Sequence, residues 1–320
     1  METKELLKWS AQIKLREKSR QEDRFAHGHR LCAGCGAPTV VKMVLMATEY
    51  PVVVANATGC LEVSSCIQEY TAWKTPWIHS AFENAAATVA GVETMYRALR
   101  KTTSSLPDNV KFIAFGGDGG TYDIGLQSLS GAMERGHDML YICYDNGAYM
   151  NTGIQRSSAT PLGADTTTAP VGSANPLGKL QARKDLTRIM AAHGIPYAAQ
   201  ASPSHWLDLM TKVKKAHEIK GPKFMNIIAP CNRGWRTSTD SSIELSRLAV
   251  ETCYWPLYEV EDGKLRVTVM PEEKKPAQLF FKPQGRFKHL FAPGNEGLLE
   301  QVQAGIDRIW ERLLKESECM

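Results

Sequence analysis

The feature that most constrains the fold of this chain is a series of short apolar runs separated by helical patterns. Runs rich in valine, isoleucine and aromatic residues occupy 52–55, 110–115, 139–144 and 224–229. Strand-like runs that alternate with helices are typical of βαβ units, which build a parallel sheet. Because these runs are apolar on both faces, they favour a sheet with helices on both sides. The sequence therefore predicts an α/β fold with a doubly wound, mostly parallel sheet.

Helical patterns fill the intervals between these runs. The segments 36–50 and 123–136 repeat apolar residues at helical spacing, and 81–101 is rich in alanine, the best helix former. Gly136 stands where a C-capping glycine would end its helix. The segment 156–179 is rich in Thr, Ser, Pro and Gly, which predicts a long ordered loop. Loops of that length in compact domains are often functional.

The two ends of the chain differ from this centre. Segment 1–20 mixes Leu, Ile and Trp with charges, which is typical of a short amphipathic helix, and we interpret it as a docking arm. Towards the C-terminus, 258–269 carries a hairpin pattern and 296–315 predicts a final helix. We therefore divide the chain into an N-terminal arm, 1–27, a central domain, 28–250, and a C-terminal extension, 251–320.

Composition excludes several classes of protein. Of 320 residues, 43% are hydrophobic and 22% charged, as in soluble globular proteins, and the net charge of +4 neither requires nor excludes an acidic partner. No apolar run has the length of a membrane span or the form of a signal peptide. We therefore expect a cytoplasmic protein with no membrane or nucleic-acid partner. Its eight cysteines are poor disulfide candidates, because the cytosol keeps thiols reduced.

Chemically active residues follow each of the four apolar runs. Cys60, Asp118, Asn146 and Cys231 lie two to five residues beyond the end of a run. In a parallel sheet the carboxyl ends of the strands meet at one edge, where open α/β sheets bind ligands. The sequence thus predicts that these four residues share one site.

A glycine-rich stretch, FGGDGGTYDIG, surrounds one of these residues. Glycines alone are equally typical of a tight turn. Asp118 and Asn146, however, fall on neighbouring strand ends, and a carboxylate, an amide oxygen and a backbone carbonyl with water and phosphate oxygens suit octahedral Mg²⁺. The next helix would turn its N-terminus towards the same place and bind a diphosphate. We interpret the glycines as positions where phosphate oxygens approach the backbone.

Longer motifs narrow this interpretation. The stretches GGDGGTYDIGLQSLSGAMERG and YDNGAYMNTGIQRSSATPLGADTTTAPVG together resemble the thiamine-diphosphate-binding motif of the 2-oxoacid:ferredoxin oxidoreductases. The stretches GHRLCAGCGAP, ATGCLEVSS, IHSAFENAAATVAGVE and WPLYEVEDG resemble the beta subunits of those members that act on pyruvate. The resemblance runs from about Gly28 into the C-terminal extension.

The resemblance implies roles for individual residues. It places Mg²⁺ on Asp118, Asn146 and the carbonyl of Ala148. It implies that Asn151 also faces the substrate and takes part in catalysis. The residues that it assigns to the binding of thiamine diphosphate are Gly117, Asp118, Gly119, Gly120, Asn146, Ala148, Asn151 and Cys60.

Four cysteines form a second group. Cys32 and Cys35 form a CxxC motif directly before a predicted helix, whose N-terminus would stabilise their thiolates. With Cys60 and Cys231 they could make a four-thiolate pocket. Zinc uses similar ligands, but zinc modules usually draw close pairs from one short segment, whereas four dispersed cysteines also suit a [4Fe–4S] cluster. Uninvolved core cysteines are a third possibility from spacing alone. The resemblance places a [4Fe–4S] cluster on these four residues.

As a member of this family, the chain would be the beta subunit of a heteromeric enzyme. The resemblance implies that this enzyme converts pyruvate, CoA and oxidised ferredoxin to acetyl-CoA, CO₂ and reduced ferredoxin, or runs the reverse reaction. Partner subunits would supply the aminopyrimidine site with its activating glutamate and further [4Fe–4S] clusters. Three alternatives stay open: another acid (2-oxoisovalerate, 2-oxoglutarate or oxalate), a non-oxidative thiamine enzyme with incidental cysteines, and a zinc-stabilised scaffold subunit without catalytic activity.

Other polar residues are interpreted as structural or solvated. Glu83 invites the role of the activating acid, but the family draws that residue from a different subunit. Arg156 and Lys179 flank the long loop and are expected to be solvated. A basic set near the C-terminus is expected to form a protein interface or a solvated face: Lys274, Lys275, Lys282, Arg286 and Lys288.

Overall fold

The computed structural model describes residues 13, 15–67 and 69–318 of the chain. Most of the predicted N-terminal amphipathic helix lies outside the described residues. The first described helix is a single turn, α2 (Leu15–Lys18). No helix in the described part of the chain has the length and apolar character needed to cross a bilayer.

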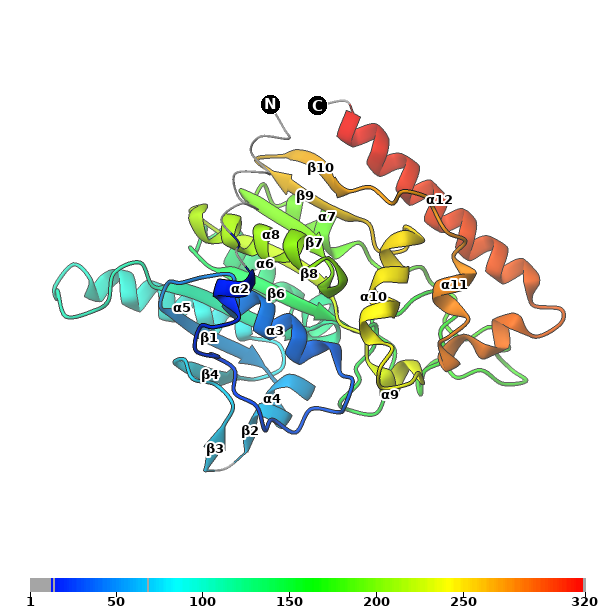
Figure 1. The fold of residues 1–320 in the computed structure, drawn as a ribbon, viewed down its shortest axis with the longest axis horizontal. Helices are drawn as coiled ribbons and strands as arrows, with labels where there is room; N and C mark the ends of the chain where they lie inside the picture. Colours follow the sequence, from blue (N-terminus) through cyan, green and yellow to red (C-terminus); the bar gives the residue numbers. More distant parts are fainter. Residues whose placement is uncertain (1–12, 14, 68, 319–320) are drawn as a thin grey trace.

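One eight-stranded sheet forms the centre of the molecule, with the strand order β10-β9-β7-β8-β6-β5-β1-β4 (Figure 1). The strands from β7 to β4 in this order are parallel, and only β9 and β10 are antiparallel to their neighbours. The predicted α/β fold with a mostly parallel sheet is therefore confirmed. The parallel strands are β1 (Val52–Ala57), β4 (Trp77–Ser80), β5 (Lys111–Gly117), β6 (Leu140–Asp145), β7 (Tyr197–Ala201) and β8 (Lys223–Ile228).

The four predicted strands correspond to β1, β5, β6 and β8, whereas β4 and β7 were not predicted. β4 is an edge strand with exposed side chains at its centre, so it lacks a continuous apolar run. β7 has the sequence YAAQA, and alanine is a poor strand former. All five residues are buried, so tertiary packing stabilises this strand. In both strands, pairing with a neighbour rather than local composition determines the structure.

Helices cover both faces of the sheet, as expected for a doubly wound fold (Figure 1). α3 (Gly36–Met46) and α8 (Trp206–Glu218) pack on one face, in a core with residues of β1, β6 and β8. The helices on the other face are α5 (Ala85–Leu99), α6 (Leu126–Glu134) and α7 (Leu186–Ala191).

The C-terminal part continues the same sheet. β9 (Leu257–Glu261) and β10 (Lys264–Val269) form the predicted hairpin, and β9 pairs with β7. The turn between them contains Asp262 and Gly263, both with the positive φ that a tight hairpin requires. The predicted last helix is α12 (Glu296–Glu318). Between hairpin and last helix lie α11 (Gln278–Phe281) and a 3₁₀ segment, Gly285–Phe291.

Short elements surround the carboxyl edge of the parallel strands. After β1 come α4 (Cys60–Ser65) and the two-stranded pair β2 (Cys66–Ile67) and β3 (Tyr70–Thr71). α9 (Asn232–Trp235) and α10 (Ser242–Glu251) follow β8. The predicted loop 156–179 contains no regular element beyond isolated bridges.

Candidate active site

A cleft of about 360 Å³ lies at the carboxyl edge of the sheet, where β1, β5 and β6 end. Pairing in register brings Gly117 at the end of β5 beside Tyr144 of β6, so the loops that leave these strands are neighbours. The cleft contains every residue that the sequence assigned to cofactor binding: Cys60, Gly117, Asp118, Gly119, Gly120, Asn146, Ala148 and Asn151. Asn151 is exposed at the cleft, whereas Asp118 is fully buried.

Asp118 is held in place by neutral donors. Its carboxylate accepts hydrogen bonds from the backbone N–H of Asn146, at 3.2 Å, and from the hydroxyl of Ser157. It forms no ion pair with any residue that the structure describes. Burial and the neighbouring Asp145 carboxylate raise its pKa well above the ordinary value. A buried acid without a cationic partner is suited to a ligand that supplies positive charge.

The Asn146 side-chain amide lies within hydrogen-bonding distance of the Asp118 carboxylate and of the Ala148 carbonyl. The side-chain amide of Asn146 lies 2.9 Å from the carbonyl oxygen of Ala148 and 2.9 Å from Asp118 Oδ1. Both neighbours are acceptors, so without a cation the amide would turn its nitrogen to them and donate twice. With its oxygen on this side, three oxygens converge. Adjacent ligands of octahedral Mg²⁺ are also about 2.9 Å apart, given metal–oxygen distances of about 2.05 Å.

Aromatic side chains lie close to both glycines beside Asp118. A Cβ atom on Gly119 would lie 2.5 Å from the ring of Tyr149, and one on Gly117 would lie 3.3 Å from the ring of Tyr144. The backbone conformation does not demand glycine here, because Gly119 has helical φ and ψ of −59° and −47°. Tyr149 also stacks on Phe82, with ring centroids 5.6 Å apart. The close aromatic rings therefore give a second reason for glycine here, besides the predicted approach of phosphate oxygens to the backbone.

The helix after the glycines begins differently from the prediction. A π-helical turn, Gly120–Ile124, precedes α6, and the N–H of Gly125 donates to the carbonyl of Gly120 at 2.7 Å. A Cβ atom on Gly125 would lie 2.3 Å from that same oxygen, so this turn depends on glycine. Single π-helical turns inserted before or within helices are frequent at functional sites.

The four predicted cysteine ligands lie near one another, next to the cleft. Cys35 precedes α3, Cys60 begins α4, and Cys231 caps α9 with its sulfur 3.4 Å from the N–H of Gly234. Burial, followed by the Cys231, Cys60 and Cys32 thiols, raises the pKa of Cys35 to about 12. Burial, Cys231, Cys32 and Asp118 likewise raise the pKa of Cys60 to about 11. The predicted stabilisation of a thiolate at Cys35 by the α3 N-terminus is therefore outweighed by burial.

Zinc and a four-iron cluster differ in how they arrange four cysteine ligands. In the described part of the chain, no group of three or more His, Cys, Asp or Glu side chains is arranged to hold a single metal ion. Four sulfurs around one zinc would be about 3.8 Å apart, given Zn–S distances of about 2.3 Å. A cluster of four irons holds its thiolates farther apart, because each sulfur binds a different corner of a cube. The two kinds of site therefore differ in how far apart four thiolates lie.

Comparisons with known proteins identify the family. A family model described as the thiamine pyrophosphate enzyme C-terminal TPP binding domain matches residues 57–227. The chain is 55% identical over 304 residues to the pyruvate synthase subunit PorB of Thermotoga maritima, covering 93% of each chain. It is 52% identical to the subunit of the same name in Methanocaldococcus jannaschii, covering 90% of this chain and 95% of the relative. The chain belongs to the family of 2-oxoacid:ferredoxin oxidoreductase beta subunits.

Two further similarities were found, one to a curated relative and one to a solved structure. The ketoisovalerate oxidoreductase subunit VorB of Pyrococcus abyssi is 44% identical, covering 93% of this chain and 94% of the relative. A solved structure of 2-oxoglutarate:ferredoxin oxidoreductase from Magnetococcus marinus superposes with a TM-score of 0.52 at 19% identity. This match covers 73% of this chain and 80% of the other, and supports the fold. The family that the sequence motifs indicated is confirmed.

Under the cleft of this beta subunit lies a polar network that the sequence did not reveal. Asp145 Oδ2 accepts hydrogen bonds from the Tyr122 hydroxyl and from the Arg183 guanidinium, each at 2.7 Å. Asn226 donates to the same Tyr122 oxygen at 2.6 Å. The network neutralises Asp145 and fixes the strand end from which Asn146 projects. Asp145 could have been noticed beside Asn146, but nothing local marks Arg183, which is 38 residues away along the chain.

Two residues expected to be solvated are buried in this beta subunit. Lys179 is 1% exposed and donates to the carbonyl of Thr160, and burial lowers its pKa to about 8. Arg286 is 2% exposed and lies over the ring of Trp235, 4.3 Å from its centroid. The long loop and the C-terminal segment fold over these cations, which composition could not show. Arg156 and Glu83 are exposed.

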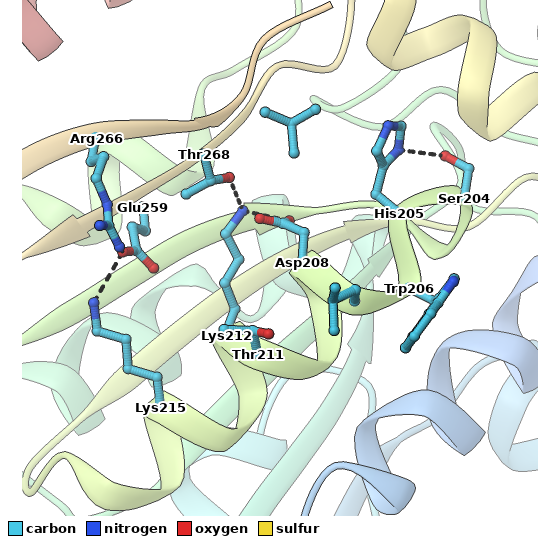
Figure 2. A pocket seen from close by; sticks show the side chains of 12 residues that line it. Ser204, His205, Trp206, Asp208, Thr211, Lys212, Lys215, Glu259, Arg266 and Thr268 are labelled. Atoms are coloured by element: carbon cyan, nitrogen blue, oxygen red, sulfur yellow. Dashed lines mark hydrogen bonds and ion pairs between the residues drawn. The ribbon is translucent and has the colours of Figure 1, made fainter. Parts of the chain in front are cut away.

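A second, larger hollow of about 1050 Å³ lies between α8 and β10 (Figure 2). It contains none of the predicted site residues. Lys212 pairs with Asp208 at 2.7 Å, and Lys215 pairs with Glu259 at 3.0 Å. Arg266 forms an ion pair with the same glutamate. Since its charged groups are paired within the wall, this groove, hereafter the α8–β10 groove, does not resemble a site for a charged cofactor.

Proposed function

We propose that this beta subunit binds the diphosphate end of thiamine diphosphate through Mg²⁺ and carries an adjacent [4Fe–4S] cluster in a pyruvate:ferredoxin oxidoreductase. The observation that carries the proposal is the meeting of Asp118, Asn146 and the Ala148 carbonyl in one cleft whose wall also contains Cys60. A carboxylate, an amide oxygen and a carbonyl are the donors that Mg²⁺ prefers.

The residues of the cleft divide the work of holding the cofactor. Asp118, Asn146 and Ala148 would ligate Mg²⁺, while Gly117, Gly119 and Gly120 would leave room for the diphosphate. Bound thiamine diphosphate supplies the carbanion chemistry by which 2-oxoacids are decarboxylated. The Asp145 network keeps the Asn146 loop in place. Asn151, which is exposed at the cleft, would orient the substrate.

The cysteines Cys32, Cys35, Cys60 and Cys231 would ligate the cluster. Cys60 belongs to both groups, since it lines the cleft and is an electrostatic neighbour of Cys32 and Cys231. A cluster adjacent to the cofactor can accept electrons one at a time and pass them through further clusters of a partner subunit to ferredoxin. Ligation needs reduced thiols, so we assign the enzyme to the cytoplasm.

The activating glutamate would come from a partner subunit. Among the described residues that line the cleft, Asp118 is the single carboxylate, and it is committed to Mg²⁺ in this proposal. Glu83 is exposed and is not part of the lining. The isolated chain should therefore be inactive, and the assembled enzyme should use CoA and a 2-oxoacid. Pyruvate is favoured because two similar relatives are named pyruvate synthase subunits.

The test is anaerobic purification of the chain with its partner subunits, followed by metal and cofactor analysis. About four irons, four sulfides and one thiamine per beta chain are expected for one cluster and one cofactor. Zinc without iron, or full activity without thiamine, would overturn the proposal. Turnover of pyruvate, 2-oxoisovalerate, 2-oxoglutarate and oxalate by the same preparation then ranks the acids. Higher turnover of 2-oxoisovalerate would match the VorB relative instead.

A further inference from the structure

A buried arginine from the C-terminal segment lies beside the proposed site. Arg286, in the 3₁₀ segment Gly285–Phe291, is 2% exposed. Its guanidinium lies over the Trp235 ring at 4.3 Å and beside the Phe287 ring at 5.0 Å. Its Nε donates to Gln284 Oε1 at 2.9 Å, and Gln284 in turn donates to the carbonyl of Phe280 at 2.6 Å. The cation is therefore contacted on three sides, and none of the described carboxylates forms an ion pair with it.

Arg286 contacts the loop that holds the proposed Mg²⁺ ligands. The indole N–H of Trp235, the ring under the guanidinium, donates to the backbone carbonyl of Asn146 at 2.6 Å. Gly147, the next residue, approaches the guanidinium so closely that a Cβ atom there would lie 3.0 Å from Arg286 Nη1. Arg286 and Trp235 together thus hold the backbone between the ligands Asn146 and Ala148.

The same pair is connected to a proposed cluster ligand. Trp235 ends α9, the short helix that Cys231 caps, and its N–H donates to the Cys231 carbonyl at 2.8 Å. Burial lowers the pKa of Arg286 to about 10, and Tyr254, followed by the Cys231, Asp118 and Asp145 side chains, acts in the opposite direction. The guanidinium therefore remains charged at neutral pH, within electrostatic reach of both halves of the site.

We propose that Arg286 is a positioning residue whose fixed buried charge raises the reduction potential of the [4Fe–4S] cluster, while its packing on Trp235 fixes the Asn146–Ala148 loop. This inference rests on the proposed function, since it requires the cluster. Reduction adds one negative charge to a cluster, and a nearby cation that water screens poorly stabilises the reduced form. Arg286 would therefore favour transfer of an electron from the cleft to the cluster.

Redox titration of the assembled enzyme, monitored by the electron paramagnetic resonance of the reduced proximal cluster, tests the charge. Arg286→Met is expected to change the oxidised-to-reduced ratio at a fixed potential about tenfold towards the oxidised form, a shift of about −59 mV for one electron. Arg286→Lys keeps the charge but not the planar stacking, so it should retain most of the potential. Lys288→Met removes an exposed charge two residues away and should leave the potential unchanged.

Loop positioning has a separate readout. Binding of thiamine diphosphate and Mg²⁺, followed by quenching of protein fluorescence, should weaken several-fold in both Arg286→Lys and Arg286→Met, because neither side chain reproduces the stacked guanidinium. Unchanged binding in both variants would overturn the positioning role. An unchanged potential in an iron-replete Arg286→Met enzyme would overturn the charge role.

A second variant decides the case if Arg286→Met does not fold. Gln284→Glu is nearly isosteric and puts a negative charge at the acceptor of the Arg286 Nε–H, which cancels the cation locally. It should lower the potential in the same direction, and an unchanged potential would contradict the inference. If the parent enzyme contained no iron, the proposed function itself would fail, and iron analysis distinguishes that result from a failure of the Arg286 inference.

Discussion

The cleft and the α8–β10 groove of this beta subunit differ in whether their charged side chains form ion pairs. In the groove, Lys212 donates to Asp208 and to Thr268, and Glu259 pairs with Lys215 and Arg266 (Figure 2). Lys212 also donates to the Gln200 carbonyl at 2.8 Å. In the cleft, Asp118 is fully buried and has no ion pair among the described residues. The groove is the larger of the two, with about 1050 Å³ against about 360 Å³.

The difference indicates that a buried carboxylate without an ion-pair partner identifies the proposed site better than the size of a hollow does. A buried ionised group without a partner costs several kcal/mol, so a fold retains one where a ligand compensates it. The charged groups of the groove, in contrast, already pair with one another. Matched substitutions in the cleft and in the groove therefore test whether the cleft is the active site.

The largest effect is expected from the carboxylate itself. Asp118→Asn should lower turnover of the assembled enzyme more than about 100-fold and abolish co-purification of thiamine, because even residues behind a metal ligand are worth about 10–100-fold. The matched control is Asp208→Asn in the groove, which should retain activity.

In the cofactor-free subunit the same two substitutions should change the free energy of unfolding in opposite directions. Asp118→Asn should raise the unfolding free energy by about 1 kcal/mol, and Asp208→Asn should lower it by a similar amount.

Removal of a thiolate should have the next largest effect. Cys231→Ser should eliminate the resonance of the reduced [4Fe–4S] cluster and leave less than about 1% of ferredoxin reduction, since each cysteine binds one iron. Cys66→Ser changes a half-buried cysteine outside the group of four and serves as the control. An intact cluster signal in Cys231→Ser would contradict the assignment of this residue.

A methyl group in the cleft should have a moderate effect. Gly119→Ala would place its Cβ atom 2.5 Å from the Tyr149 ring, so the ring must move. We expect a loss of about 1–3 kcal/mol of stability and about tenfold weaker binding of thiamine diphosphate, measured by calorimetry. Gly172→Ala, where a Cβ atom would have no neighbour within 4 Å, is the control and should change neither quantity.

The smallest effect on activity is expected from a substitution in the groove. That substitution should instead change how stability depends on pH. The Lys215, Lys212, Tyr197 and Arg266 groups outweigh burial and lower the pKa of Glu259 from 4.5 to about 2. Its stabilisation is therefore present above pH 4.5 and is lost as the pH falls towards 2. Glu259→Gln should lose about 2 kcal/mol at pH 7 in urea unfolding, and less at pH 3. A marked loss of turnover would show that the groove is functional.

The pH dependence at Asp118 should have the opposite sign. Because its pKa is raised in the folded, cofactor-free chain, folding favours the protonated form. Its contribution to stability is present below the ordinary value of 3.8 and is lost as the pH rises through the raised value. Addition of Mg²⁺ with thiamine diphosphate should remove this dependence, since the cation stabilises the ionised form.

The sequence was sufficient where neighbours along the chain determine the structure. The runs that became β1, β5, β6 and β8 are apolar enough to identify, and the residues just beyond them reach one edge because parallel strands end together. The hairpin β9–β10 was visible from its Asp-Gly turn and alternating pattern.

Residues whose environment depends on distant segments could not be predicted. Tyr149 explains Gly119 from 30 positions away, Arg183 neutralises Asp145 across 38 positions, and Arg286 reaches the site from the far end of the chain. The pKa of Cys35 depends on how deeply the fold buries it, which outweighs the local effect of the helix N-terminus. The sequence shows which side chains are charged, but it does not show which of them the fold buries.

Phe280, Phe281 and Phe287 form an aromatic layer that a shortened version of the chain would need to keep. These rings pack in one cluster with Trp235 and Ile228, and Met150 of the cleft and Cys231 lie against it. A truncation at residue 227, where the family model ends, would remove Cys231 together with this layer. Fusions and minimal versions of the subunit should therefore keep the chain at least through Phe291, where the segment that carries Arg286 ends.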